Sequence, residues 1–588
     1  MRRLFLALLF TVSLSLYAQS PQLTGETIGN NKGWTGIDLG TPHIIDQVSW
    51  IPNASSIERS VRLGVFEGAN EPDFSDGVPL YLIDEDGIMG ETQSADITVT
   101  RPFRYVRYIS PSSYKSKIAQ VAFFGHETTD SIGEELLYQP TNLPCVVVHV
   151  EGEQTPVDKV NDLVASFSII SDGGRKELHE PGTFRLRGNA SIDFEKKPYR
   201  IKFEKKQNVL NAPAKAKKWT LIASYGDKTL MRNIVGFELS RRFGQAYTPY
   251  IQPVDLFVNG EYKGCYQLCD QVEAGKGRLE IEEMEASDVT GGYLIEVDAY
   301  ADREAPDSWF KSSNGNPVTI KSPDDDKINI KQKNYIMRDF KQLETLLFGN
   351  DFDNETEGYR KMFDLTSFLN HFLIGELNGN TDTYWSLYMY KPRDGELIYT
   401  GPVWDLDLAF DNDNRTYPID NLRDWIYATK GSIAGNFRKF VSRIVKDDKR
   451  AIADLKTIWA DARHNRNINA ESLHAFIDQL AEELEASQQL NFKRWNIMNR
   501  TVHQNPKIWG SYAAEVENIK NYISKRIKKM DTWLSYDPSS VDELTSPQEK
   551  QITGIYTIHG IPVTAPQTGN TYLYKYSDGS SEIVYLNF

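Results

Sequence analysis

The sequence contains few cysteines. Only Cys145, Cys265 and Cys269 occur among its 588 residues, and an odd number of three does not make a disulfide framework. Cys265 and Cys269 lie in one strand-like run, where four residues span about 13 Å, too far for a bridge between them. We therefore expect the three cysteines to be small buried apolar residues.

Several short catalytic signatures are also missing. The sequence has no HExxH and no GxSxG, which argues against the common metalloproteases and α/β-hydrolases. Gly275-Lys276-Gly277 superficially resembles part of a phosphate-binding loop, but the full GxxxxGK[ST] pattern does not occur. Catalysis, if present, must use another arrangement.

Long hydrophobic runs are absent after the first residues. In Met1–Gln19, Arg2 and Arg3 precede an apolar stretch that ends in Tyr17-Ala18-Gln19. This pattern predicts a secretory signal peptide over residues 1–19, because the run is too short for a membrane span and a polar segment follows. A retained membrane anchor is the alternative. We expect a secreted, cell-surface or periplasmic protein with no transmembrane segment after signal cleavage.

Basic residues do not predominate. The chain has 66 Lys and Arg against 81 Asp and Glu, a net charge of −15, which argues against a nucleic-acid partner. Hydrophobic residues make up 40% and charged residues 25%, the balance of an ordinary folded protein. At about 150 residues per domain, the length predicts several domains.

Residue patterns along the chain predict a multidomain α+β protein. Short strands with turn signals, such as Ile44–Trp50, Val61–Phe66, Arg104–Ile109 and Ile118–Phe124, predict a β-sandwich. A strand-rich stretch followed by a mostly helical one predicts two lobes around a cleft, where ligands tend to bind. The predicted order is a β-sandwich over 21–127, a linker over 128–142, a two-lobed domain over 143–536, a linker over 537–549 and a small β-module over 550–588.

Two aspartates stand at the ends of a predicted hairpin. Asp382 precedes the strand-like run Ser386–Lys391, and Asp405 follows the returning strand, so both should lie at the same end of the pair. Two such carboxylates could accept a proton from a hydroxyl and hold Mg²⁺ on phosphates. Asp405 and Asp407 could instead belong to a structural Ca²⁺ site or a solvated loop, and a glycosidase pair also stays open.

A basic segment supplies candidates for phosphate binding. Arg187 and Asn189 lie in a turn-like loop, and Lys202 follows in a strand. A strand lysine can neutralise phosphates when a glutamate on a following helix orients it, and Glu238 is the candidate. The simpler interpretation is an exposed edge strand that carries lysines.

Seven motifs follow one another between about Leu143 and Leu534: RGNAS, KKPYRIKF, LIASYGDKTLMRN, PVDLFVNGEYKGCYQL, GGYLIEVD, NTDTYW and PVWDLDLAF. Their combination and order resemble the CotH family of spore-coat-protein-H-like atypical protein kinases. The resemblance implies a kinase-like fold, binding of ATP with Mg²⁺, and phosphorylation of Ser or Thr on a protein. It implies that Asp382 is the catalytic aspartate, that Asp405 holds the metal, and that Lys202, Glu238, Arg187 and Asn189 serve the nucleotide.

One departure bears on the metal site. Many members of the family have Asn where Ser386 stands here, so a second Mg²⁺ would need another ligand, for which Asp407 is the candidate. Two alternatives follow: the chain transfers AMP instead of phosphate, or it is a non-catalytic surface or glycan-binding protein on a degenerate kinase-like scaffold.

Both ends of the mature chain resemble other modules. Gly33–Gly40, Val65–Asn70 and Phe103–Tyr108 are similar to the discoidin-like (F5/8 type C) family, which implies a glycan or cell-surface ligand. Gly554–Val563 resembles the C-terminal sorting modules of secreted Bacteroidetes proteins.

Overall fold

The computed structural model divides the chain into two compact units. The first comprises the described residues up to Tyr138, with Gly173–Lys176 and Gly260–Tyr262, and the second comprises the rest. The structure describes residues 20–29, 33–53, 61–111, 118–128, 135–419, 424–429, 436–537, 551–557, 560–567, 570–577 and 581–585. The predicted signal peptide, and most of the linker predicted over 537–549, lie outside these residues.

The first unit is built from strands. Its longest strand, β2 (Trp34–Pro52), pairs with β6 (Phe103–Ile109) through its first half and with β7 (Ile118–Glu127) through its second half. The predicted strands fall on β2, β6 and β7, whereas Val61–Phe66 overlaps only the start of β3. The other strands are β1 (Glu26–Ile28), β3 (Val65–Ala69), β4 (Val78–Leu82) and β5 (Gln93–Asp96).

The second unit opens with a closed barrel of strands. Alternate residues of β11 (Tyr199–Gln207) are buried, which points Ile201 and Phe203 inward and Lys202 outward. Asn259-Gly260 is a sequence typical of a tight hairpin turn, and both residues have positive φ between the strand that ends at Val258 and the strand that begins at Glu261. In barrel order the strands are β10 (Arg175–Leu186), β11, β12 (Ala216–Ile222), β14 (Glu261–Asp270), β13 (Ile251–Val258), β8 (Cys145–Val150) and β9 (Leu163–Ser171).

A separate five-stranded sheet follows the barrel in the chain. Its central strand, β15 (Tyr293–Asp298), pairs antiparallel with β17 (Pro317–Ser322) on one side and with β18 (Ser386–Lys391) on the other. The predicted hairpin is confirmed: β18 pairs with β19 (Tyr399–Thr400). The remaining strand, β16 (Trp309–Lys311), pairs with β17.

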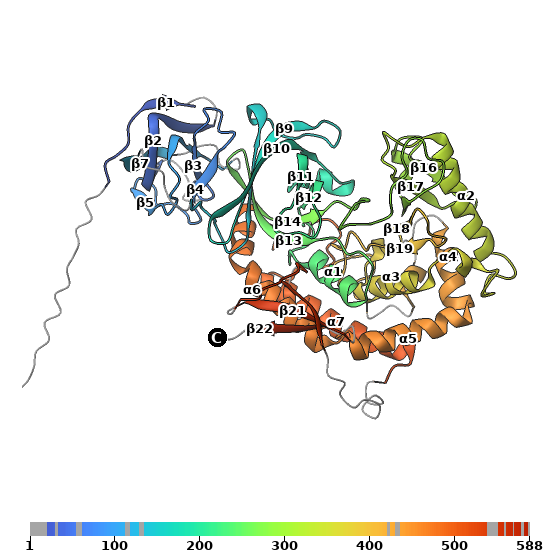
Figure 1. Ribbon diagram of the computed structural model, residues 1–588. Coiled ribbons are helices and arrows are strands. Elements are labelled where there is room, and N and C mark those ends of the chain that lie inside the picture. Colours follow the sequence, from blue (N-terminus) through green and yellow to red (C-terminus); the bar gives the residue numbers. More distant parts are fainter. Residues whose placement is uncertain are drawn as a thin grey trace, which may run out of the picture. The chain divides into compact units, whose positions relative to one another are not determined.

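Helices fill the second half of this unit. At its centre, α3 (Leu365–Asn378) packs against α1, α5, α7 and β19 (Figure 1). The mostly helical stretch that the sequence predicts after the strand-rich one is confirmed. The other helices are α1 (Arg232–Arg242), α2 (Ile330–Leu347), α4 (Phe437–Ser442), α5 (Lys449–Asn465), α6 (Ala470–Arg494) and α7 (Tyr512–Leu534).

A small sheet ends the chain. It consists of β20 (Ile552–Thr557), β21 (Thr571–Tyr576) and β22 (Ser581–Tyr585). The sequence Asp578-Gly579 predicts a hairpin turn, but both residues lie outside the described part of the chain. The three cysteines are buried and free, as predicted. Within the described ranges, no helix is both long and apolar enough to cross a membrane.

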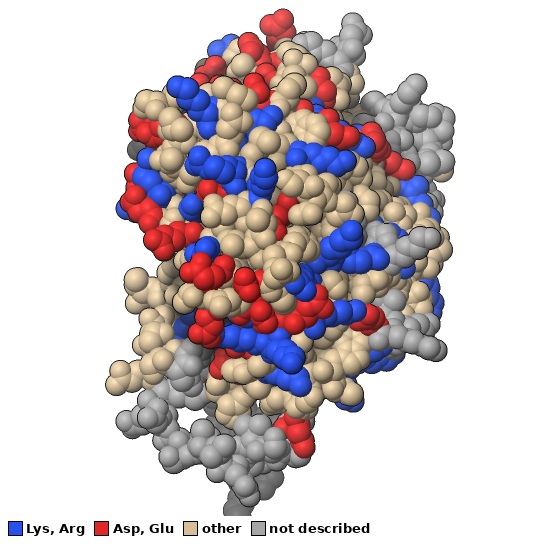
Figure 2. Space-filling view, turned by 90° about the vertical axis from the view of Figure 1, so that its right-hand side faces the viewer, with Lys and Arg blue, Asp and Glu red and all other residues tan. Residues whose placement is uncertain are grey.

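The architecture is a mixed α/β fold with several sheets. Acidic and basic side chains are intermixed over the face drawn in Figure 2. The two kinase-like lobes stay a prediction.

Candidate active site

Five of the predicted site residues line one cavity of about 320 Å³. These residues are Arg187, Asn189, Asp382, Asp405 and Asp407. Further charged or titratable side chains on the wall are Glu296, Asp298, Glu304, Lys321, Arg415 and His503. The described lining therefore carries six carboxylates against three Lys or Arg cations, and this excess of negative charge favours the entry of a cation.

The end of α3 places Asp382 at the cavity. Gly379 stops the helix in the left-handed region (φ 67°), and a Cβ there would collide with the Tyr522 hydroxyl, so the position requires glycine. Asn380 then ties two loops together: its side chain accepts from the Asp382 amide at 3.4 Å and donates to the Asp405 carbonyl at 3.0 Å. The two predicted aspartates are thus coupled through one amide side chain.

Arg415 holds the Asp382 carboxylate. Its Nη2 lies 2.7 Å from Asp382 Oδ1, and its Nε lies 2.9 Å from both oxygens of Asp413, which is fully buried. Burial raises the pKa of Asp382, and the Arg415 guanidinium works against that rise. Arg415 was not predicted, because nothing in its local sequence distinguishes it from any loop arginine.

Asp405 and Asp407 are presented on either side of a buried leucine. Leu406 is only 2% exposed, and its amide donates to Asn233 Oδ1 at 2.9 Å. Asp405 adopts a left-handed backbone (φ 60°), a conformation that aspartate tolerates better than most residues. The anchored leucine therefore fixes where the two flanking carboxylates emerge.

The two carboxylates share their electrostatic environment with Asp382. Burial, followed by repulsion from Asp382, raises the pKa of Asp405 to about 6. Burial also raises the pKa of Asp407, with further contributions from Asp405 and Asp382. Carboxylates that repel one another in this way are stabilised when a cation binds between them.

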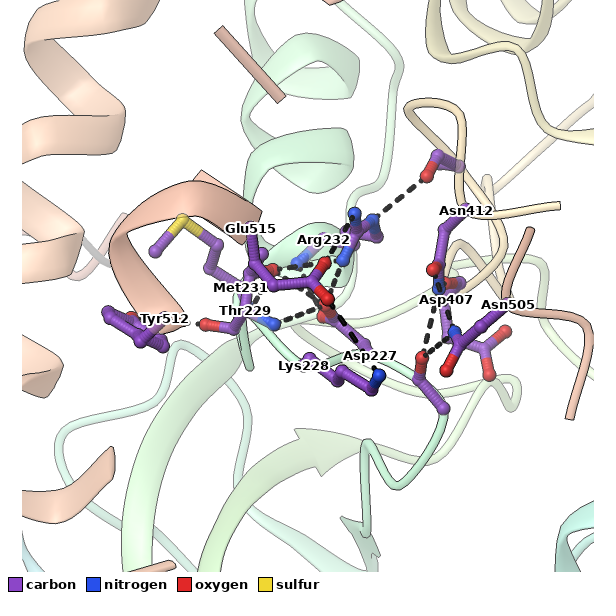
Figure 3. Close-up of polar contacts among 12 residues, drawn as sticks. Asp227, Lys228, Thr229, Met231, Arg232, Asp407, Asn412, Asn505, Tyr512 and Glu515 are labelled. Carbon is purple, nitrogen blue, oxygen red and sulfur yellow. Dashed lines mark hydrogen bonds and ion pairs between the residues drawn. The ribbon is translucent and has the colours of Figure 1, made fainter. Parts of the chain in front are cut away.

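A buried polar network supports the loop that carries Asp407 (Figure 3). Asn412 donates to the carbonyls of Asp407, at 2.8 Å, and Gly226, at 3.0 Å, and Asn505 also donates to Gly226. Beside it, the buried Arg232 pairs with Asp227 at 2.6 Å. Segments far apart in the sequence therefore hold this side of the cavity.

Arg187 faces the same carboxylates from the loop after β10. Its guanidinium lies 5.7 Å from the Trp404 ring centre. Burial lowers the pKa of Arg187, and the Asp405 charge works in the opposite direction. Asn189, in the same loop, accepts from Lys159 at 3.1 Å. Both residues line the cavity, and the contact with phosphate that the family resemblance implies for them stays a prediction.

Lys202 and Glu238 do not join this group. Lys202 is exposed on the outer face of the barrel, and Glu238 is buried in α1, where it pairs with Arg241 and Arg242 at 3.0 and 2.9 Å. The predicted Lys202–Glu238 pair is therefore corrected: strand alternation turns Lys202 outward, and two arginines of the same helix neutralise Glu238. The edge-strand interpretation is also wrong, since β11 pairs with β10 and β12.

The sequence analysis also missed Glu296, Asp298 and Lys321. Glu296 and Asp298 alternate in the buried strand YLIEVD, and Lys321 lies in the similar strand β17. Acidic residues two apart share one face of a strand, and a charge in a buried strand needs a partner or a function. The two acidic residues in the otherwise apolar run YLIEVD were therefore a signal that the sequence itself contains.

The donor set suits Mg²⁺, although the described residues hold no group of three His, Cys, Asp or Glu side chains arranged for a metal. Mg²⁺ keeps several waters and commonly takes one or two protein carboxylates together with substrate phosphates. Asp405 and Asp407 provide such carboxylates beside the basic Arg187.

Comparison with known protein families identifies the larger part of the chain. The family model described as CotH kinase protein matches residues 184–530, which contain every predicted site residue. The chain belongs to the CotH family. The match includes the cavity, its aspartates and most of α7, so these features form part of the CotH domain.

No curated protein matches the chain. Among solved structures, CBM62 from Clostridium thermocellum Xyl5A is similar, with 33% identity over 18% of this chain and 98% of that chain and a TM-score of 0.17.

Proposed function

We propose that this CotH-family chain is an exported atypical protein kinase that transfers phosphate from ATP to Ser or Thr of a protein. The observation that carries the proposal is that Asp382 and Asp405 line one cavity with Arg187. A proton acceptor, a metal-holding carboxylate and a phosphate-binding cation are the parts that phosphoryl transfer needs, because its catalysis consists of positioning and charge stabilisation.

Asp382 has the role of orienting the acceptor hydroxyl and taking its proton. Arg415 contacts Oδ1 of its carboxylate, which fixes the side chain, and Oδ2 is the oxygen we assign to the hydroxyl. The hydroxyl oxygen then forms a bond to the γ-phosphorus of ATP, the bond from that phosphorus to the bridging oxygen breaks, and ADP leaves with its electron pair. Arg187 offsets negative charge on the oxygens during transfer.

Asp405 and Asp407 would hold Mg²⁺. When bound, MgATP supplies the transferable phosphoryl group and a positive charge on the phosphate oxygens. The repulsion that raises the pKa of both aspartates would be relieved by that cation.

The decisive experiment replaces Asp382 by Asn. We expect Asp382→Asn to lose autophosphorylation and transfer to Ser- or Thr-containing proteins by about 10²-fold or more, while MgATP still binds. Intact-mass spectrometry after incubation with MgATP measures the product. The matched control is Asp325→Asn, an exposed residue outside the cavity, which should retain activity.

The same mass measurement separates the alternatives. Addition of AMP instead of phosphate would replace the kinase proposal with nucleotide transfer. A wild-type chain that binds MgATP but modifies neither itself nor any protein tested would contradict catalysis, and would favour a non-catalytic scaffold.

We propose further that the first unit binds a glycan or a cell-surface ligand. The support is the discoidin-like sequence together with Arg104, whose side chain is 42% exposed and pairs with Asp38 at 2.8 Å. A guanidinium has five N–H donors, more than this pair uses, so donors remain for the oxygens of a ligand. Polysaccharide pull-down with the wild type and Arg104→Ala tests this; equal retention of both would exclude Arg104.

Export is proposed from the signal-peptide pattern alone. N-terminal sequencing of the protein recovered outside the cytoplasm should begin close after Gln19, and an intact Met1 would contradict cleavage.

A further inference from the structure

The cavity has a lysine on its wall that the sequence analysis did not select. Lys321, on β17, is the only lysine among the described residues that line the cavity. Lys202 lies outside, on the barrel surface. A lysine ammonium is a compact charge with three donors, and proteins commonly use it to bind phosphate oxygens.

The other two cations of the cavity already have roles. Arg415 is committed to Asp382 and Asp413, and Arg187, 5.7 Å from the Trp404 ring centre, is the cation to which the proposed function assigns the transferred phosphoryl group. The Lys321 ammonium lies 3.3 Å from Glu296, longer than the roughly 2.8 Å of a strong charge-assisted hydrogen bond. Glu296 is its only hydrogen-bond or ion-pair partner in the described part of the chain, so donors remain for a ligand.

Neighbouring strands orient the lysine. Glu296, on β15, lies opposite Thr319 of β17, and the Ser386 hydroxyl at the start of β18 donates to Glu296 Oε1. Ser386, Glu296 and Lys321 are thus linked in a row by side-chain contacts across β18, β15 and β17. Ser386 stands where the family resemblance led us to expect Asn, and here its hydroxyl holds the glutamate that pairs with Lys321.

The same strands are joined to the loop of Asp382. The Trp385 amide donates to the Asp382 carbonyl at 2.9 Å, and the Ala299 amide donates to the Trp385 carbonyl at 3.0 Å. The strand that carries Glu296 is therefore attached directly to the segment that carries the catalytic candidate.

The lysine keeps its charge in this position. Burial works to lower the pKa of Lys321, but attraction to Glu296, Glu304 and Asp298 outweighs it, so the pKa is raised. A charged ammonium that is partly shielded from water interacts more strongly with an anion entering the cavity than an exposed one does.

We infer that Lys321, oriented by Glu296 and Ser386, contacts the phosphate chain of the bound nucleoside triphosphate. This inference rests on the proposed function and deepens it, because it names the residue that takes the role first predicted for Lys202.

Calorimetric titration of the full chain with MgATP and with adenosine tests the inference. We expect Lys321→Ala to weaken MgATP binding about tenfold or more, as for a lost hydrogen bond to a charged group, and to leave adenosine binding unchanged. Lys321→Arg, which keeps the charge, should retain most of the MgATP affinity. Lys202→Ala tests the competing prediction, and Lys205→Ala, at an exposed position of β11, is the matched control.

The outcomes separate this inference from the proposed function. Unchanged MgATP affinity in Lys321→Ala, or a loss in Lys202→Ala alone, overturns the role of Lys321 and leaves the kinase proposal standing. Equal weakening of MgATP and adenosine would mean a structural effect and also overturns it. If the wild type does not bind MgATP, both proposals fail. Should Lys321→Ala not fold, Lys321→Gln replaces it in the same titration.

Discussion

His371 shows at the scale of one residue how burial sets a pH response. It lies in α3, 3% exposed, and burial lowers its pKa to about 4. On the amphipathic helix its side chain is a packed core residue, as its place in the sequence pattern predicts. The folded state therefore keeps this imidazole neutral at pH values where the unfolded chain, with a histidine pKa of about 6.5, would protonate it.

We predict that His371 makes the larger unit less stable as pH falls from 6.5 towards 4. In that window the unfolded state binds one more proton than the folded state, so stability falls by about 1.4 kcal/mol per pH unit, or about 3 kcal/mol by pH 4. His371→Leu should remove this part of the dependence. Denaturant unfolding of both proteins at several pH values measures it.

The control for this prediction is His464→Leu, at an exposed position of α5, which should follow the wild type. Parallel pH profiles for His371→Leu and the wild type would show that His371 is protonated in the folded protein.

At the scale of elements, α7 fixes the helix that delivers Asp382. Arg526 of α7 donates to the Glu376 carbonyl at 2.8 Å and pairs with its carboxylate at 3.2 Å, and both side chains are fully buried. The same carboxylate accepts from the Tyr384 hydroxyl and from the amides of Ile426 and Tyr427. One buried glutamate thus joins α3, α7 and the segment after Asp382.

We predict that Arg526→Met costs about 3–5 kcal/mol in the free energy of unfolding, because it leaves the Glu376 charge buried without its partner. The double variant Glu376→Gln/Arg526→Met should recover part of the loss, since the uncompensated charge is gone. Denaturant midpoints measure both. A cost below about 1 kcal/mol for the single variant would mean that Glu376 is neutral in the fold.

At the scale of the whole molecule, the chain has two compact units with separate cores. We predict two unfolding transitions in calorimetry, and MgATP should raise only that of the larger unit. A ligand that binds only the folded state at 100 times its Kd stabilises it by about 2.7 kcal/mol. A glycan ligand should raise only the other transition.

The pairing of ligand and transition can be checked by adding both ligands together, where each should act independently. A single cooperative transition, or one raised by both ligands, would contradict two independent units.

Local signals predicted much of the fold. The helices α2, α3, α6 and α7 and the Asn259-Gly260 turn follow from periodicity and turn chemistry. Asp382 and Asp405 were brought together by a hairpin, a contact between neighbours in sequence. The predicted pairing of Lys202 with Glu238 was wrong for two reasons. Residue type and spacing do not reveal whether a strand position faces a cavity or solvent, and they do not reveal that two arginines lie nearer to Glu238.

The sequence by itself determined the family, the two aspartates and the alternation of strands and helices, because these depend on local backbone preferences and on motifs in a fixed order. Only the tertiary structure decided which cations meet those aspartates. Lys321, Arg415 and Glu296 come from separate segments, and side chains distant in sequence become neighbours only when packing of the barrel, sheet and helices sets which face of each strand is turned inward.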